Sequence, residues 1–466
     1  MDQSVSSQTG AAATYVHPAV LCLLLLGGVL ILLLPRKYVV IPLLSAGLLL
    51  PMDQIVMVGP LHFYLLRLLL AFAVIRALAS KFSSRGDRRS RKMTAMDAIV
   101  ILLGFSGAIN YVILSGSWGA VVNQLGILYT MFGGYFVIRF SIRSESDVVR
   151  TIRALAYIEV VIAVLMLLEY STGRNAYVVL GGGRQMAREN LVERNSHFRA
   201  MAAFNSPIRA GTLGGTSLAL FLALWWKGKN DRLVALVGCC AATAITVASA
   251  SSTPLTAYLA GVGALFLWPL RRHMRFVRWG IASALVFLHI VMRAPVWALI
   301  QRIDLTGGSG HHRYLLVDNF IRRFGEWWMI GTNKNAEWGM SMWDLANQYV
   351  FVGVSYGLLP FILFLAIITF GFKYVGAARK VTNSRNQQRF LWALGAALFS
   401  HVVAFLGISY MDQIVLSWYT LLAVICAATA PLLPQGPPVA HSINPQSDTD
   451  VRAGQSERLD GCDLLV

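Results

Sequence analysis

Apolar runs follow one another along almost the whole chain, separated by short polar connections. A helix of about twenty apolar residues is long enough to cross the bilayer core. The pattern therefore predicts about thirteen membrane-spanning helices (about 12–14), although the run at 38–56 also fits a re-entrant segment. The expected spans are 20–34, 38–56, 60–80, 96–115, 118–140, 149–170, 207–226, 232–250, 254–270, 277–297, 351–373, 388–409 and 412–433.

Composition agrees with this pattern, because 56% of the residues are hydrophobic and only 13% are charged. A soluble protein carries about 25% charged residues. A soluble enzyme, a collagen-like chain and a mostly disordered protein are thus excluded. The sequence predicts an all-α polytopic membrane protein. It has a short outer segment (1–17), a membrane domain (18–433) and a disordered cytoplasmic tail (434–466).

The net charge of +18 comes from 40 Lys and Arg against 22 Asp and Glu. In a soluble protein such a balance suggests nucleic acid as a partner. Here most basic residues lie in short loops, where they set the topology, so no nucleic-acid partner is expected. The basic loop at 81–92 is assigned to the cytoplasm. Strict alternation then places 143–153, 227–232, 271–278 and 373–389 on the same side.

Two longer connections, about 171–206 and 298–350, fall on the outer face and are rich in arginine. Basic residues oppose translocation, so a function on the outer side is expected to require them. A guanidinium fork grips phosphate oxygens bidentately, which fits a lipid pyrophosphate. Pairing with loop carboxylates or with anionic lipid is the alternative. The arginines are Arg174, Arg184, Arg188, Arg194, Arg199 and Arg209 at the first loop, and Arg302, Arg313, Arg322 and Arg323 in the second.

Two further features are candidates for substrate binding. The second loop carries aromatic residues, among them Trp343 and Tyr349, which either stack on sugar rings or form an interfacial belt. Arg67 lies inside the apolar run Leu65-Leu66-Arg67-Leu68-Leu69. A charge at that depth is costly and indicates function, unless the side chain snorkels to the surface.

Motifs in both loops resemble those of the O-antigen polymerase and O-antigen ligase superfamily. In the second loop the resemblance rests on Gly310-His311-His312-Arg313-Tyr314, Trp327-Trp328-Met329-Ile330-Gly331-Thr332, Asp344-Leu345-Ala346-Asn347-Gln348-Tyr349-Val350 and Tyr356-Gly357-Leu358-Leu359. In the first loop it rests on Arg199-Ala200 and on Phe204-Asn205-Ser206-Pro207-Ile208 with Gly211.

The resemblance implies a GT-C type glycosyltransferase of the bacterial inner membrane, active on the periplasmic side. Its donor is a polyprenyl-pyrophosphate-linked oligosaccharide, with no nucleotide sugar, metal or cofactor, and a chain-length regulator is a candidate partner. Arg199 and Arg313 are expected to contact the donor pyrophosphate and to stabilise the leaving group, with Arg209 and Arg67 as further donor-binding residues.

The sequence departs from the family pattern at two places. Ala346 stands where the ligases carry a histidine, which favours a polymerase and makes Asp344 the candidate general base, with His311 and His312 as the alternatives. Asn347, Tyr349, Trp343 and His312 are the candidate acceptor-binding residues. Ser251-Ser252-Thr253-Pro254 replaces a Ser-Arg-Gly element, so the missing arginine is expected to come from Arg209 or Arg293.

Two alternatives to a polymerase remain open. One is a ligase that transfers glycan to a lipid or protein acceptor. The other is a transporter of lipid-linked glycan, which should show repeated halves and charged groups at midplane. No clear repeat is visible, and the apolar runs carry few charges.

Overall fold

The computed structural model describes residues 16–51, 54–58, 61–83, 93–181, 193–194, 197–302 and 310–433. The predicted tail at 434–466 lies outside them, as do Arg184 and Arg188. Seven of the described helices are long and apolar enough to cross a membrane, which confirms an all-α membrane protein. They are α5 (Ala95–Ser115), α6 (Trp118–Ser141), α7 (Glu145–Thr172), α8 (Pro207–Leu224), α9 (Lys229–Ala248), α11 (Met274–Val291) and α16 (Leu358–Val381).

The N-terminal region departs from the predicted spans. Between α2 (Pro18–Leu33) and α4 (Leu65–Ser83) the chain forms η1 (Arg36–Tyr38), α3 (Val40–Leu49) and an antiparallel hairpin of β1 (Ile55–Val58) and β2 (Leu61–Tyr64). The ten residues of α3 rise only about 15 Å, half the thickness of a bilayer core. The span predicted at 38–56 is therefore not a single crossing helix.

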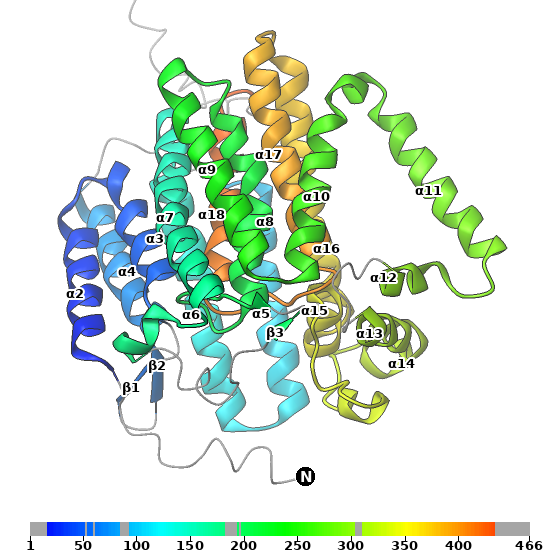
Figure 1. Ribbon diagram of the computed structural model, residues 1–466. Helices are drawn as coiled ribbons and strands as arrows, with labels where there is room; N and C mark the ends of the chain where they lie inside the picture. Colours follow the sequence, from blue (N-terminus) through cyan, green and yellow to red (C-terminus); the bar gives the residue numbers. More distant parts are fainter. Residues whose placement is uncertain are drawn as a thin grey trace, which may run out of the picture. The chain divides into compact units, whose positions relative to one another are not determined.

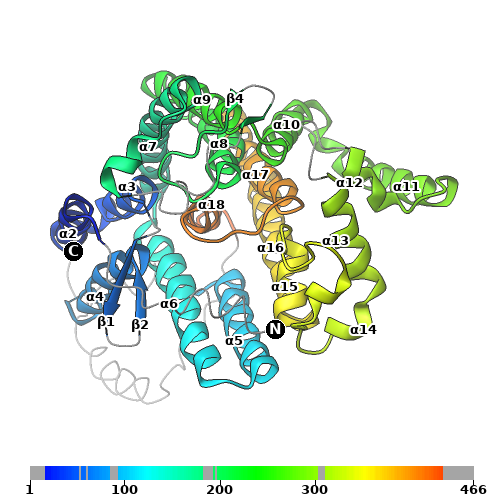
Figure 2. The same ribbon diagram turned by 60° about the horizontal axis from the view of Figure 1, so that its bottom comes forward.

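Three shorter or less apolar helices complete the bundle, namely α10 (Ser252–Phe266), α17 (Arg385–Ala404) and α18 (Ile414–Thr429). At its centre, α8 packs against α7, α9, α10 and α17 (Figures 1 and 2). Glycines make these approaches close. A Cβ on Gly214 would lie 2.6 Å from the Ala242 carbonyl oxygen of α9, and one on Gly215 would lie 2.5 Å from the Pro254 carbonyl oxygen of α10. Small residues let backbones approach and gain van der Waals contact, which drives helix association in lipid.

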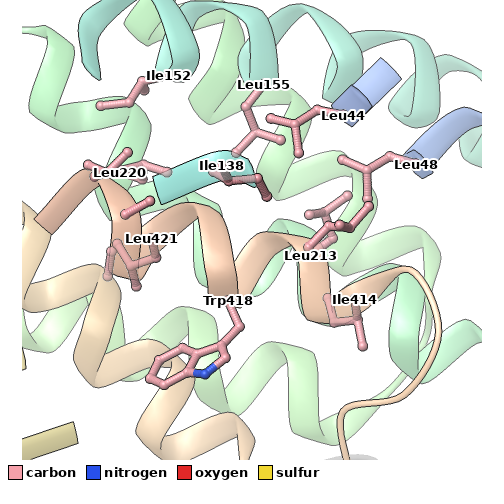
Figure 3. Packing of buried hydrophobic residues seen from close by; sticks show 14 of the residues in the cluster. Leu44, Leu48, Ile138, Ile152, Leu155, Leu213, Leu220, Ile414, Trp418 and Leu421 are labelled. Carbon is pink, nitrogen blue, oxygen red and sulfur yellow. The ribbon is translucent and has the colours of Figure 1, made fainter. Parts of the chain in front are cut away.

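Large aliphatic side chains fill the space around α8 and α18 (Figure 3). Leu213 and Leu220 of α8 belong to the same buried cluster as Ile414, Trp418 and Leu421 of α18, and α3, α6 and α7 contribute further leucines and isoleucines. All of these side chains are buried. The core therefore joins helices that are far apart in the sequence and fixes where the loops between them lie.

The basic connections gather at one end of the bundle. Lys227 is ion-paired with Glu145, whose carboxylate also accepts a hydrogen bond from Gln387. Arg379 donates to the Arg271 carbonyl oxygen (3.3 Å). These contacts bring the connections after α6, α8, α10 and α16 to the same end, as alternation predicts.

The predicted loop at 298–350 is folded. After η4 (Trp268–Arg272), α11 and η5 (Val296–Ala298), it forms short helices that pack around Leu316, Phe320 and Trp327. Trp338 donates to Glu326 (2.8 Å), and this hydrogen bond is the main reason that the pKa of Glu326 lies below its ordinary value. The helices are α12 (Leu299–Arg302), α13 (Gly310–Arg322), α14 (Phe324–Trp327), η6 (Asn335–Trp338) and α15 (Gln348–Tyr356).

Helix α11 lies apart from the bundle (Figure 1), and none of its residues is buried. The first long connection contains η3 (Ala176–Leu180) and a short hairpin of β3 (Glu193–Arg194) and β4 (His197–Phe198). This connection ends at the strap 199–206, which leads into α8.

Candidate functional site: an arginine site and an apolar cavity

Arg199 and Arg313 meet at the start of α10. Arg199 donates from Nη2 to the Ser251 hydroxyl (2.8 Å), and Arg313 donates from Nη1 to the Ser252 hydroxyl (3.3 Å). Arg313 is only 7% exposed. The two arginines come from different predicted outer loops, yet they bind adjacent serines. These four residues are called the arginine site below.

Glu169, near the end of α7, holds the strap that carries Arg199. Its buried carboxylate accepts hydrogen bonds from the backbone N–H groups of Met201 (3.0 Å) and Ala202 (2.8 Å). The side chain of Asn175 donates a third hydrogen bond to it (3.0 Å). Ala202 has a positive φ of 47°, a backbone conformation that costs free energy and needs such support. Glu169 therefore fixes the chain just after Arg199.

The close packing of α8 and α10 places the two serines. Gly211 leaves room for Ser249 and Pro254 beside α8. On the other side, the hydroxyl of Thr253 donates to the Gly407 carbonyl oxygen (3.3 Å). The first N–H groups of α10 have no partner within their own helix, so this end carries partial positive charge. Together with two guanidinium groups, the site favours an anion with several oxygens.

Arg313 is set by the packing of α13. Leu316 and Phe320 anchor this helix on Trp327 and on α15. The predicted acceptor residue His312 lies beside Arg313, and its Nε2 is 3.0 Å from the Ser341 carbonyl oxygen. That contact ties the start of α13 to the turn that carries Trp343 and Asp344.

Arg209, also predicted to bind the donor, contacts a different partner. It forms an ion pair with Asp412, which also accepts a hydrogen bond from Asn205 (3.3 Å). Asp412 has a positive φ of 57° and lies on the loop at 405–413, between α17 and α18. Strained backbone of this kind is a common feature of functional sites.

Arg67 lines a separate cavity of about 410 Å³. Most of the wall is apolar and comes from α5, α6, α15 (Gln348–Tyr356), α16 and α18, and Asp412 is also one of the lining residues. The Arg67 guanidinium carbon is 5.5 Å from the centre of the Tyr64 ring. A Cβ on Gly126 of α6 would lie 2.7 Å from that carbon, so a side chain at this position would displace the guanidinium group. Neither Arg199 nor Arg313 lines this cavity.

The remaining predicted residues fall into two groups. Asn347 is buried and caps α15, because its Oδ1 accepts from the N–H groups of Tyr349 (2.9 Å) and Val350 (3.2 Å). The Tyr349 hydroxyl donates to the Val402 carbonyl oxygen (2.9 Å). These two side chains hold α15 against α17. Trp343, 73% exposed, and Asp344 lie on the surface.

Sequence reasoning missed four residues that shape these sites. Ser251 and Ser252 stood out only as a departure from the family pattern, although small polar residues before a proline are a signal for a helix start. Asp412 is a lone carboxylate between two apolar runs, which marks a connection rather than a span. Glu169 lies within an apolar run, where a charge indicates function or a specific partner.

In the described residues, no three His, Cys, Asp or Glu side chains are grouped to hold a metal ion.

No family model matches the chain, and no match was found among curated proteins. The fold and composition define the class, which is a helical membrane protein.

Proposed function

We propose that the protein is a polysaccharide polymerase of the bacterial inner membrane. It transfers glycan from a polyprenyl-pyrophosphate carrier to an acceptor glycan on the periplasmic side. The observation that supports this most strongly is the convergence of Arg199 and Arg313 on Ser251 and Ser252. Buried arginine is costly in a membrane protein and is usually retained for an anionic ligand or partner.

A diphosphate suits this site for a physical reason. In the transfer, the acceptor hydroxyl oxygen attacks the anomeric carbon, and the bond to the carrier oxygen breaks. The electron pair of that bond passes to the diphosphate, whose negative charge grows in the transition state. Two guanidinium groups held in place by serines stabilise this charge without rearranging. Each planar fork can bind two phosphate oxygens.

The acceptor proton requires a base, and two carboxylates are candidates. Asp344 is exposed on the turn that His312 contacts, whereas Asp412 is paired with Arg209 at the edge of the cavity. Phosphate binding to Arg209 would release the Asp412 carboxylate, whose oxygens could then accept the proton of the acceptor hydroxyl. Asp412 is therefore the base we favour.

The proposed orientation follows from charge. The connections rich in lysine and arginine lie at the end where Lys227 and Glu145 pair, and this end is assigned to the cytoplasm. The two arginine-rich connections belong to the opposite end and are assigned to the periplasm, where lipid-linked glycan is presented.

A ligase would use the same donor site with a different acceptor. A transporter of lipid-linked glycan would use the cavity and break no bond. Reconstitution separates these functions. Purified protein in liposomes receives a polyprenyl-pyrophosphate-linked repeat unit as the only sugar source. A ladder of longer lipid-linked glycans is the expected result. Unchanged donor, or donor that only crosses the bilayer, would refute the polymerase.

Variants of single arginines test whether the arginine site is responsible for the glycan ladder. Arg199→Ala and Arg313→Ala should abolish the ladder at unchanged protein levels. Arg174→Ala and Arg322→Ala are the controls, because these side chains are exposed and lie in the same two regions. A ladder lost in the controls as well would show that the surface charge of the loops, rather than the site, is responsible.

A further inference from the structure

The cavity next to Arg67 is amphiphilic. Leu103, Leu128 and Ile367 are among the apolar residues that line it, and Arg67 contributes a cation (about 410 Å³). Of the described residues, Asp412 is the other charged group that lines the cavity, and its carboxylate is ion-paired with Arg209, which does not line it. Because Arg209 offsets the charge of Asp412, Arg67 is the cation that faces the apolar wall. An apolar wall with such a cation is complementary to an anionic headgroup on a hydrocarbon chain.

The helices around the cavity suit a ligand that enters from lipid. The walls come from α5, α6, α15, α16 and α18. Leu102 and Phe105, which neighbour the wall residues on α5, are 57% and 51% exposed. A lipid chain in the cavity would therefore be bound beside helices that already face the bilayer.

The loop at 405–413 lies between this cavity and the arginine site. The Gly407 carbonyl oxygen of this loop accepts from Thr253, next to the arginine site. Phe405, Tyr410, Met411 and Asp412 of the same loop line the cavity. The two places where an anion would bind thus share one loop but no arginine.

We propose that the cavity binds the second lipid carrier, the one that presents the acceptor glycan, with its diphosphate on Arg67 and its polyprenyl chain along the apolar wall. This inference rests on the proposed function, because transfer between two carriers requires two lipid sites. It also moves Arg67 from the donor set to the acceptor side. Asp412 then lies where the acceptor hydroxyl would approach the donor.

Photolabelling of the full-length protein in liposomes tests this. The probe is a polyprenyl diphosphate without sugar that carries a diazirine on its chain, and the control probe is the neutral polyprenol. Label is expected on α5 and α6. It should fall about tenfold or more in Arg67→Gln, because hydrogen bonds to a charged group are lost. Label should also fall in Leu103→Trp, which fills the cavity, and persist in Leu102→Trp, which changes the exposed neighbour.

The donor-site variant distinguishes the two proposals. In Arg199→Ala/Arg313→Ala the label on α5 and α6 should persist, because the second site is separate. Loss of this label in the double variant, with retention in Arg67→Gln, would overturn the inference and make the cavity part of the donor site. Equal labelling by the neutral polyprenol would also overturn it. The expected labelling pattern without any glycan ladder would instead overturn the proposed function and leave an anionic-lipid site.

Discussion

Replacement of Arg313 by alanine is the most informative perturbation of the arginine site. The side chain is 7% exposed and lies 3.3 Å from the Ser252 hydroxyl, so water does not easily take the place of the lost guanidinium group. A preorganised donor that faces developing charge contributes about 100- to 1,000-fold in rate, or about 2.7–4 kcal/mol. Loss of its hydrogen bond should reduce the free energy of unfolding by about 1–3 kcal/mol.

The assay is the initial rate of ladder formation in liposomes, measured at equal amounts of folded protein. Arg313→Ala is expected to lose at least about 100-fold, and Arg313→Lys should be intermediate because the charge remains while the fork is lost. Ser252→Ala should stay within about tenfold of the parent protein, since it removes one hydrogen bond and leaves both guanidinium charges in the site.

Three results would refute the reasoning about Arg313. The first is a rate for Arg313→Ala within about threefold of the parent rate. The second is full activity of Arg313→Lys, which would mean that only a point charge is needed. The third is a larger loss in Ser252→Ala than in Arg313→Ala, which would assign the catalytic contribution to the hydroxyl.

Glu169→Gln should lower the transfer rate about tenfold with little change in thermal stability, because a neutral side chain accepts weaker hydrogen bonds from the backbone N–H groups of the strap. An unchanged rate would show that Glu169 does not position Arg199. Asp412→Asn should abolish transfer while donor photolabelling persists, and Asp344→Asn should remain active; the reverse ranking would identify Asp344 as the base. Gly215→Leu should destabilise the protein by several kcal/mol in thermal melts, since even a Cβ there would meet α10 at 2.5 Å. Gly263→Leu on α10 is its control, because a Cβ there meets nothing within 4 Å.

Hydropathy alone predicted the long spans closely. The expected spans at 96–115 and 118–140 correspond to α5 (Ala95–Ser115) and α6 (Trp118–Ser141). Bilayer thickness imposes helix length, so an apolar run of that size leaves little choice. Hydropathy failed where the apolar run was not one helix. The residues Ile55–Val58 are apolar and, except for Met57, β-branched, and they pair as a strand with Leu61–Tyr64.

The break between α15 and α16 shows a second limit of prediction from sequence. The span predicted at 351–373 is interrupted at Gly357, which has a φ of +88°. A Cβ at this glycine would lie 2.7 Å from the Met329 carbonyl oxygen, so the chain turns there to let two backbones approach. A glycine in an apolar run does not reveal such a contact, because the partner is distant in the sequence.

The candidate site was predictable only in part. Arginine in the two predicted outer loops led us to expect an anionic ligand, and it pointed to Arg199 and Arg313 separately. Their meeting at Ser251 and Ser252 depends on how α8, α10 and α13 pack, which no local pattern encodes. The predicted partition of donor and acceptor residues stays a prediction. The side chain of Asn347 is buried as a helix cap, a placement that depends on the packing of α15.

The central claim is that two arginines and two serines hold the carrier diphosphate. The most direct measurement is an electron cryomicroscopy map of the protein in nanodiscs with a polyprenyl diphosphate bound. The expected result is density for two phosphates between Arg199 and Arg313, beside the start of α10. Phosphate density elsewhere, with the guanidinium groups still on Ser251 and Ser252, would contradict the claim.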